Sequence, residues 1–361
     1  MRIAVIGAGF SGMSFCININ SFGKLYDIDL YEASNDVGLK ILKTGNGRCN
    51  LSNEDISDKN YNKEFVEYID KFGYIKNYYS DECIKFLDKI NIKTRVDKGR
   101  IYPYSNKAES VKKAYEYALK KYRINVILNA YIDKIDIIGS KYKIYSVMYD
   151  YVIIATGGII GSLYNGYELV KNLSVDISNL TPALVGIKIE EKIASLDGVR
   201  MIGEVTCGSF NEIGEIQFKK DGLSGIVIMN LSRYYNKGII SINFGVNVDK
   251  SYFNTNMEEK VMSMYPFKLA SYILKSNNVV ESIYSMKFTI KSFYGFDQAQ
   301  ITKGGVRLDQ LCEGFELFTY KNIYTIGELI DVDGECGGYN IHNAICSGLI
   351  SSRNVLNKIV K

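Results

Sequence analysis

Apolar and polar positions along the chain predict strands and helices in alternation near both ends. Residues 2–6 form a short apolar, β-branched run of the kind that is buried in a parallel sheet. A helical stretch follows up to Gly23, and residues 26–31 then alternate apolar and polar positions as a second strand. Further strands are expected at 125–130 and 151–154, and a long helix from about Asn340 to Ile359.

The turn between the first strand and the first helix has the pattern G-x-G-x-x-G. Glu32, at the end of the second strand, lies 20 positions beyond the third glycine, which is the spacing of a dinucleotide-binding βαβ unit. The pattern consists of Gly7, Ala8, Gly9, Phe10, Ser11 and Gly12. Strand, glycine turn, helix and acid in this order indicate a nucleotide site rather than a turn used only for packing.

Each part of this pattern has a physical role. Gly7 makes the tight turn, Gly9 lets the backbone approach a pyrophosphate, and Gly12 allows the helix to pack closely on the strand. The helix N-terminus offers free N–H groups to the phosphates. Glu32 can accept hydrogen bonds from a ribose diol and would repel a 2′-phosphate, so the nucleotide is FAD or NAD rather than NADP. Cys16 stands where Ala or Gly is usual but is still small.

Three further glycine clusters distinguish FAD from NAD. Residues 43–53 form a polar loop, rich in Gly and Asn, that is able to wrap a ligand. Residues 151–158 are a buried strand that ends in Ala-Thr-Gly-Gly, and residues 324–340 carry a strand, a Gly-acid pair and a Gly-Gly turn that opens a helix. That helix N-terminus favours an anionic reduced flavin. Since a plain NAD enzyme does not need this later segment, FAD is favoured.

Composition and charge bear on the number of domains and on which kinds of partner are expected. The 361 residues predict about two domains, and 47% hydrophobic with 23% charged residues is typical of a globular protein. A net charge of +4, from 44 basic and 40 acidic residues, is too balanced to favour a nucleic-acid partner. No apolar run is long enough for a membrane helix. Seven cysteines without a C-x-x-C pair, and no signal peptide, predict reduced thiols in the cytoplasm and no metal site.

Several blocks of the sequence resemble one family. The chain resembles the BaiN-like NAD(P)/FAD-dependent oxidoreductases, also labelled aminoacetone-oxidase-family FAD-binding enzymes. The blocks occur in family order and span nearly the whole chain: KTGNGRCNLSN (43–53), GRIYPYSNKAESV (99–111), LTPALVGIKI (180–189), FKKDGLSG (218–225), ITKGGV (301–306) and GELIDVDGECGGYNIHNAICSG (327–348).

The resemblance implies the fold class. We expect an α/β protein: a Rossmann-like FAD-binding domain, of the two-dinucleotide-binding flavoprotein type, interrupted by an inserted β-rich domain with a small helical part. The FAD-binding domain would comprise residues 1–183 and 304–361, and the insert residues 184–303. Within the insert the pattern predicts strands at 183–193, 199–209, 213–218 and 239–248, followed by a helical stretch at 256–276.

The activity that the resemblance implies is NAD(P)H-driven reduction, through flavin N5, of a small conjugated carbonyl such as an oxo-bile acid or steroid-like enone. Two alternatives stay open: an oxidase of a small amine that uses O₂, and an FAD-binding sensor or structural protein without turnover. An RNA-modifying enzyme of the same broad fold is disfavoured by the charge balance. NAD(P)H would dock transiently, since no second G-x-G-x-x-G with its acid follows. Electron donor, substrate and oligomeric state stay open.

The chain departs from the family pattern at several positions. Only IIGSLYN (159–165) separates Gly158 from Gly166-Tyr167, where the family has a longer stretch. Lys219 and Lys220 stand in place of Thr-His, and Ile226 in place of Pro. His342 occupies a position often held by Gln. The insert is also shorter than usual.

Candidate site residues follow from the glycine clusters and the resemblance. The candidate catalytic residues are His342, Tyr339 and Arg48; Arg100 and Tyr102 belong to a loop that faces either a ligand channel or solvent. No metal ligands are expected. The expected FAD-binding residues are Gly7, Ala8, Gly9, Phe10, Ser11, Gly12, Glu32, Ala33, Lys40, Thr44, Gly45, Asn46, Gly47, Arg48, Cys49, Asn50, Ala130, Ala155, Thr156, Gly157, Gly327, Glu328, Asp333, Gly337, Gly338, Tyr339, Asn340 and Ile341.

Overall fold

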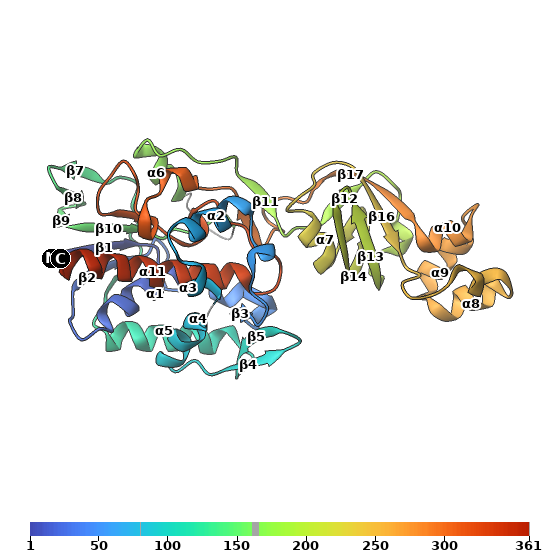
Figure 1. The fold of residues 1–361 in the computed structure, drawn as a ribbon, viewed down its shortest axis with the longest axis horizontal. Coiled ribbons are helices and arrows are strands. Elements are labelled where there is room, and N and C mark those ends of the chain that lie inside the picture. Colours follow the sequence, from blue (N-terminus) through green and yellow to red (C-terminus); the bar gives the residue numbers. More distant parts are fainter. Residues whose placement is uncertain (80, 161–165, 361) are drawn as a thin grey trace. The chain divides into compact units, whose positions relative to one another are not determined.

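The computed structural model describes residues 1–79, 81–160 and 166–360, and the chain divides into two compact units (Figure 1). The first, here called the discontinuous unit, consists of Met1–Thr181 and Thr302–Lys361. The second, the inserted unit, is the continuous segment Pro182–Ile301. Strands β11 (Thr181–Ala183) and β18 (Ile301–Lys303) stand at the two boundaries.

A five-stranded parallel sheet organises the discontinuous unit. Its strand order is β19-β10-β1-β2-β6, so segments from both ends of the chain lie in one sheet. Apolar side chains of the inner strands are buried on both faces, as the short β-branched runs predict. The bounds are β1 (Arg2–Ile6), β2 (Asp27–Tyr31), β6 (Asn125–Ile127), β10 (Tyr151–Ile154) and β19 (Ile323–Thr325).

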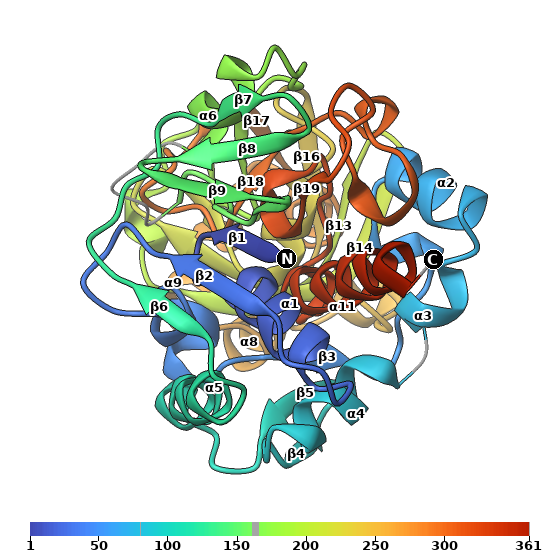
Figure 2. The same cartoon turned by 90° about the vertical axis from the view of Figure 1, so that its left-hand side faces the viewer.

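Helices α1 (Phe10–Asn20) and α11 (Tyr339–Val360) pack together below this sheet, and a small antiparallel sheet lies across its other side (Figure 2). The small sheet contains β7 (Asp136–Ile138), β8 (Lys141–Ile144) and β9 (Val147–Tyr149). All eleven residues of α1 are buried. A Cβ on Gly348 of α11 would lie 2.5 Å from the Ser11 carbonyl oxygen, so the absence of a side chain there permits the close contact of the two helices.

The remaining elements of the discontinuous unit surround this core. A second small sheet, of order β3-β5-β4, brings residues 52–53 beside residues 100–103. The bounds are β3 (Ser52–Asn53), β4 (Thr94–Asp97), β5 (Arg100–Pro103), α2 (Lys63–Lys71), α3 (Ile75–Tyr79), α4 (Glu82–Lys89), α5 (Ala108–Lys121), α6 (Gly166–Asn172) and the 3-10 segment η1 (Ile41–Gly47).

The inserted unit is a closed antiparallel barrel of order β12-β15-β14-β13-β16-β17 with its own core. Alternating burial along β14 and β17 matches the alternating sequence pattern of such strands. The bounds are β12 (Ile187–Ile189), β13 (Arg200–Cys207), β14 (Phe210–Lys219), β15 (Gly222–Ser224), β16 (Ile239–Asn243), β17 (Met286–Phe293), α7 (Ile226–Leu231), α8 (Met257–Met264), α9 (Phe267–Leu274) and α10 (Val279–Tyr284).

The predicted fold class is confirmed: a Rossmann-like parallel sheet with helices is interrupted by an inserted antiparallel domain. Some predicted elements differ in extent. The helical stretch expected at 256–276 is two helices, because Pro266 cannot donate to a helix that runs through it. Strand β17 and helix α7 were not predicted. Among the described residues, none of the helices combines the length and the apolar character needed to cross a membrane.

Candidate cofactor site

The turns that follow four parallel strands meet at the carboxyl edge of the large sheet. The Gly7 N–H donates to the Tyr31 carbonyl, and the Ala155 N–H donates to the Ile6 carbonyl, both at 2.8 Å. The Ile326 N–H donates to the Ile154 carbonyl at 3.0 Å, which brings the turn after β19 to the same edge. This edge is where ligands bind in open α/β sheets.

The glycine turn after β1 has the geometry that its sequence predicts. Gly7 has a φ of +108°, and a Cβ there would lie 2.4 Å from the Ala155 carbonyl oxygen. A Cβ on Gly12 would lie 2.0 Å from the Gly7 carbonyl oxygen. In contrast, a Cβ on Gly9 would meet no described atom within 4 Å. Space therefore exists beside Gly9, where α1 begins at Phe10 and where a phosphate would meet the helix N-terminus.

Glu32 closes the end of β2. Its carboxylate accepts the N–H groups of Ala8 and Ser34, each at 2.9 Å. Its carbonyl accepts the Ala130 N–H at 2.9 Å, which ties the end of β6 to the same place. These contacts leave further lone pairs of the carboxylate for a ribose diol, and Ala33 and Ala130 flank the position.

The Asn- and Gly-rich loop at 43–53 lies against the turn that opens α11. The Asn53 amide donates to the Gly337 carbonyl at 3.0 Å. Gly338 has a φ of +100°, and a Cβ there would lie 2.5 Å from the Ser52 carbonyl oxygen and 2.8 Å from Asn50 Oδ1. Two segments nearly 300 residues apart in sequence are therefore in close backbone contact at the start of α11.

Within this loop, Gly45, Asn46, Gly47 and Cys49 all have positive φ. Successive residues in the left-handed conformation point their N–H groups away from the hydrogen bonds of a regular helix. Loops that bind anions use such N–H groups. Thr44 donates its hydroxyl to the Ile41 carbonyl at 2.6 Å. Cys49 is fully buried, and burial raises the pKa of its thiol to about 12, so it contributes packing rather than thiolate chemistry.

Lys40 and Glu328 face each other beside the Ala-Thr-Gly-Gly turn. Lys40 Nζ donates to the Gly158 carbonyl at 2.8 Å, and Glu328 accepts the Thr302 N–H at 2.8 Å. Burial lowers the pKa of Lys40, while the Glu328 and Glu32 carboxylates oppose that shift. Burial raises the pKa of Glu328, while Lys40 opposes the shift. Glu328 of the predicted Gly-acid pair thus adjoins Gly158, where a Cβ would lie 2.4 Å from its Oε1.

The predicted cofactor residues Asn50 and Thr156 have buried polar atoms, Oδ1 and Oγ1, without a hydrogen-bond partner among the described residues. Buried polar groups are almost always paired, so such atoms indicate room for an absent polar ligand. Together with the open space at Gly9, they fit a dinucleotide held along this edge. Residues 161–165, within the shortened segment after Gly158, lie outside the described residues.

Of the other predicted cofactor residues, Asp333 is buried and its N–H donates to Asn62 Oδ1 at 3.1 Å. Asn340 donates to and accepts from the backbone of Gly334, which holds the turn before α11. Ile341 packs against the main core. Thr302 was missed: its hydroxyl accepts the Ile159 N–H at 3.0 Å, and its own N–H binds Glu328. Its place in the ITKGGV block was the available signal.

Two of the three catalytic candidates are held by side-chain or backbone partners. His342 is only 1% exposed, with Ser52 Oγ 2.8 Å from Nδ1 and the Tyr78 carbonyl 2.7 Å from Nε2. Arg48 donates to Asn106 and Asp97. These contacts give His342 and Arg48 structural partners.

Arg100, Tyr102 and Tyr339 differ in their exposure to solvent. Tyr102 lies under the Arg48 guanidinium, with its ring centroid 4.2 Å from the guanidinium carbon. Arg100 and Tyr102 both belong to strand β5 and not to the expected loop; Tyr102 is buried and Arg100 is partly exposed. Tyr339 is buried at the start of α11, where its ring meets Tyr61 edge-on.

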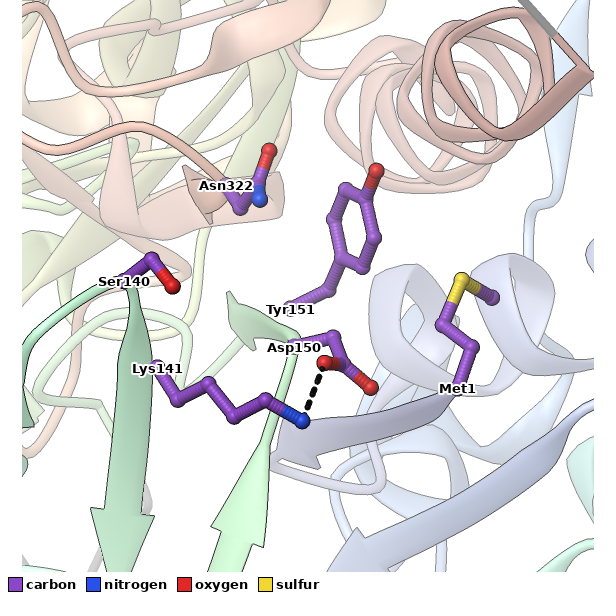
Figure 3. Close-up of a pocket in the computed structure, with 6 residues that line it drawn as sticks. All are labelled: Met1, Ser140, Lys141, Asp150, Tyr151 and Asn322. Carbon is purple, nitrogen blue, oxygen red and sulfur yellow. Dashed lines mark ion pairs between the residues drawn. The ribbon is translucent and has the colours of Figure 1, made fainter.

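A separate hollow lies at the opposite, amino edge of the sheet (Figure 3). Met1, Tyr151 and Asn322 line it from the starts of β1, β10 and β19 or the residues just before them, and an ion pair of 2.9 Å joins Lys141 to Asp150. None of the predicted site residues lines it. Its position away from the glycine turns separates it from the candidate site.

Comparisons with known proteins cover almost the whole chain. Residues 1–354 match the family model described as HI0933-like protein Rossmann domain. The chain is 28% identical to a 3-dehydro-bile acid delta(4,6)-reductase of Clostridium scindens, with 98% of each protein covered. It is 22% identical to a ribosomal RNA dihydrouridine synthase of Haemophilus influenzae, over 93% of this chain and 94% of that one. A 3-ketosteroid delta1-dehydrogenase from Sterolibacterium denitrificans shares the fold at a TM-score of 0.53 and 9% identity, with 99% of each chain covered.

Proposed function

The chain belongs to the family of HI0933-like proteins with a Rossmann domain, and from that membership we propose that it reduces a small molecule whose double bond is conjugated to a carbonyl, with NAD(P)H as electron donor. The resemblance to BaiN-like flavoproteins is confirmed, and the chain is an FAD-dependent oxidoreductase. The substrate class and NAD(P)H as the electron donor are what we propose beyond this.

The observation that carries the proposal is the end-to-end similarity to the bile acid reductase. That relative's printed name describes reduction of double bonds conjugated to a 3-oxo group. The second relative's name, a dihydrouridine synthase, describes reduction of the pyrimidine double bond beside a carbonyl. Two relatives with different substrates thus share one bond type, which favours a conjugated carbonyl here as well.

The residues at the carboxyl edge of the sheet fit FAD. Glu32 would accept the adenosine ribose hydroxyls, and the Gly9–Ser11 backbone with the N-terminus of α1 would hold the pyrophosphate. Asn50 Oδ1 and Thr156 Oγ1 would gain the partners that the described residues do not provide. The turn at Gly337 and Gly338 would bring the N-terminus of α11 toward the flavin.

Bound FAD supplies hydride transfer at flavin N5. The chain's own contribution is position and charge. The first turn of α11 carries the positive end of the helix dipole, which stabilises negative charge near the helix start. The Asn53 contact to Gly337 and the Asn340 contacts to Gly334 hold that turn in place. The Glu328 and Glu32 carboxylates both favour the charged form of Lys40 and so oppose the lowering of its pKa by burial.

The test is a visible absorption spectrum of the purified protein, repeated without oxygen after NADH or NADPH is added. Flavin bands that bleach, and return when an oxo-bile acid or steroid enone is added, support the proposal. Bands that bleach with a small amine and return in air with peroxide instead identify an oxidase. Bands that resist every donor favour a sensor, and both of these outcomes contradict a reductase.

A ribosomal RNA substrate is the second candidate, favoured by the similarity to the dihydrouridine synthase over nearly the whole chain. The net charge of +4 weighs against it, because RNA binding usually needs a strongly basic face. Retention on heparin at low salt, together with NAD(P)H-dependent loss of uridine in unmodified ribosomal RNA, would favour RNA over a small molecule. Neither result is expected.

A further inference from the structure

Three buried side chains from two helices meet inside the discontinuous unit, next to the turn that opens α11. Cys83 lies in the first turn of α4, and His342 and Cys346 lie on α11. One ligand atom from each side chain lies within 4.8 Å of the other two, and Cys346 Sγ is 3.3 Å from His342 Nε2. None of the three residues is more than 2% exposed.

The arrangement follows from helix geometry. His342 and Cys346 are four residues apart, so they share one face of α11, and α4 packs against that face. Cys83 is more than 250 residues away in sequence, which explains why Cys spacing alone gave no sign of the cluster. The pair His342 and Cys346, at helical spacing, was the one signal available.

A second layer already orients the imidazole. Ser52 Oγ lies 2.8 Å from Nδ1, and the Tyr78 carbonyl lies 2.7 Å from Nε2. The Tyr78 carbonyl can only accept, so without a metal ion Nε2 carries the proton and Nδ1 accepts from the Ser52 hydroxyl. A metal ion on the side of the two sulfurs would replace the Nε2 proton, and Nδ1 would then carry a proton and donate to Ser52 Oγ. A hydrogen bond on the far nitrogen is the usual support of a metal-bound histidine. The Tyr78 carbonyl oxygen, 2.7 Å from Nε2, would become a fourth ligand of that ion.

We propose that Cys83, His342 and Cys346 bind a structural zinc ion that joins α4 to the first turns of α11. Two thiolates and a neutral imidazole around a divalent ion have no net charge, which a buried site tolerates, whereas a monovalent ion would leave one negative charge. Tetrahedral zinc places its sulfur and nitrogen ligands about 3.5–3.8 Å apart. The 3.3 Å contact and the 4.8 Å limit require only small shifts of the side chains.

The proposal concerns stability and does not depend on the substrate. The first test is made on the wild-type protein, purified with reductant, stripped with a chelator and then titrated with zinc. We expect one tightly bound zinc per chain and a higher melting temperature. With Co²⁺ in its place, ligand-field bands of a tetrahedral thiolate site should appear in the red, where oxidised flavin does not absorb. Failure to take up either ion overturns the proposal.

Oxidation of the same cysteines is the competing use of this cluster. Peptide mapping of protein purified without reductant decides it. A disulfide between Cys83 and Cys346 as the resting state would overturn the zinc assignment. Free thiols at both positions, together with bound zinc, support it.

Variants then locate the ion. Cys83→Ala and Cys346→Ala should each abolish Co²⁺ binding, while Cys207→Ala, a buried cysteine of the inserted unit, should keep it. Ser52→Ala should weaken binding by about 10–100-fold, because it removes only the partner of Nδ1. Equal binding by the Cys83 and Cys207 variants would overturn the proposal. If a variant fails to fold, the wild-type titration still decides.

Discussion

The two units of this protein use their residues differently. In the discontinuous unit the candidate site is shaped by backbone: Gly7, Gly12 and Gly338 stand where any Cβ would overlap a carbonyl oxygen. In the inserted unit, the polar groups described here belong to side chains near the surface and not to the backbone. Lys219 lies over the Tyr294 ring, with Nζ 4.6 Å from its centroid, and Tyr294 donates to Asp221 at 2.6 Å.

This difference indicates which positions tolerate substitution and which do not. A site shaped by the backbone accepts only glycine at its closest contacts, so the glycine pattern stays recognisable in the sequence. A surface of side chains can exchange Thr-His for Lys219 and Lys220 without altering the barrel. We therefore expect the cofactor site to vary less than the surface of the inserted unit. The names of two relatives describe different substrates, a bile acid and a ribosomal RNA.

Gly12→Ala should have the largest effect. The new Cβ would lie 2.0 Å from the Gly7 carbonyl oxygen, and no flexible side chain can relieve that overlap. We expect a loss of about 3 kcal/mol or more in the free energy of unfolding and loss of bound FAD. Urea unfolding and flavin content measure this.

The control lies in the same turn. Gly9→Ala meets no described atom, so its stability should stay within about 0.5 kcal/mol of wild type while FAD binding weakens. Equal stability of the two variants would contradict a backbone-shaped turn.

Phe218→Ala tests whether the inserted unit has a core of its own. Phe218 is fully buried in the barrel beside Phe244 and Phe288. Its loss should destabilise the barrel by about 3–5 kcal/mol. Hydrogen exchange should rise in β14 and not in β1, and FAD should stay bound. Matched increases in both strands would show that the two units unfold together.

Lys40→Met should give a pH-dependent effect of about 1–3 kcal/mol. Burial raises the pKa of Glu328, so ionised Glu328 favours the unfolded state, and Lys40 opposes this. Without Lys40, ionisation of Glu328 costs more in the folded protein. The variant should therefore lose more stability at about pH 8 than at about pH 5. Urea unfolding at both values, with saturating FAD, measures it, and Lys40→Met with Glu328→Gln should remove the pH dependence.

Lys219→Thr should have the smallest effect on the protein itself. The lysine is solvent-accessible and pairs with Gln298 and the Tyr294 ring, so stability should stay within about 0.5 kcal/mol and FAD content should not change. If the inserted unit sets the substrate, KM for enone acceptors should shift while reduction by NAD(P)H does not. A changed rate of flavin reduction would place Lys219 in the cofactor half of the reaction.

The sequence predicted the parallel strands, the glycine turns, Glu32 and the helix after Gly338, because each depends on local pattern or on backbone conformations that few residues adopt. It missed α7, whose short apolar run fits either strand or helix. It also missed β17, although residues 286–291 alternate apolar and polar positions. It also missed the pairing of Arg48 with Asp97 and the meeting of Cys83 with His342, since those contacts arise only when distant segments pack. Pro266 indicates a helix boundary from the sequence alone, but the predicted helix at 256–276 was continued through it.

The discontinuity of the first unit has a consequence for synthesis on the ribosome. Residues 182–301 are contiguous, so their barrel can close as soon as they emerge. The large sheet still lacks β19 at that moment, and α1 lacks its partner α11. The nascent chain therefore carries a finished barrel on an open sheet with exposed apolar surface. We therefore expect a chain that ends after residue 301, before β19 and α11, to lose FAD and to expose apolar surface that chaperones and proteases recognise.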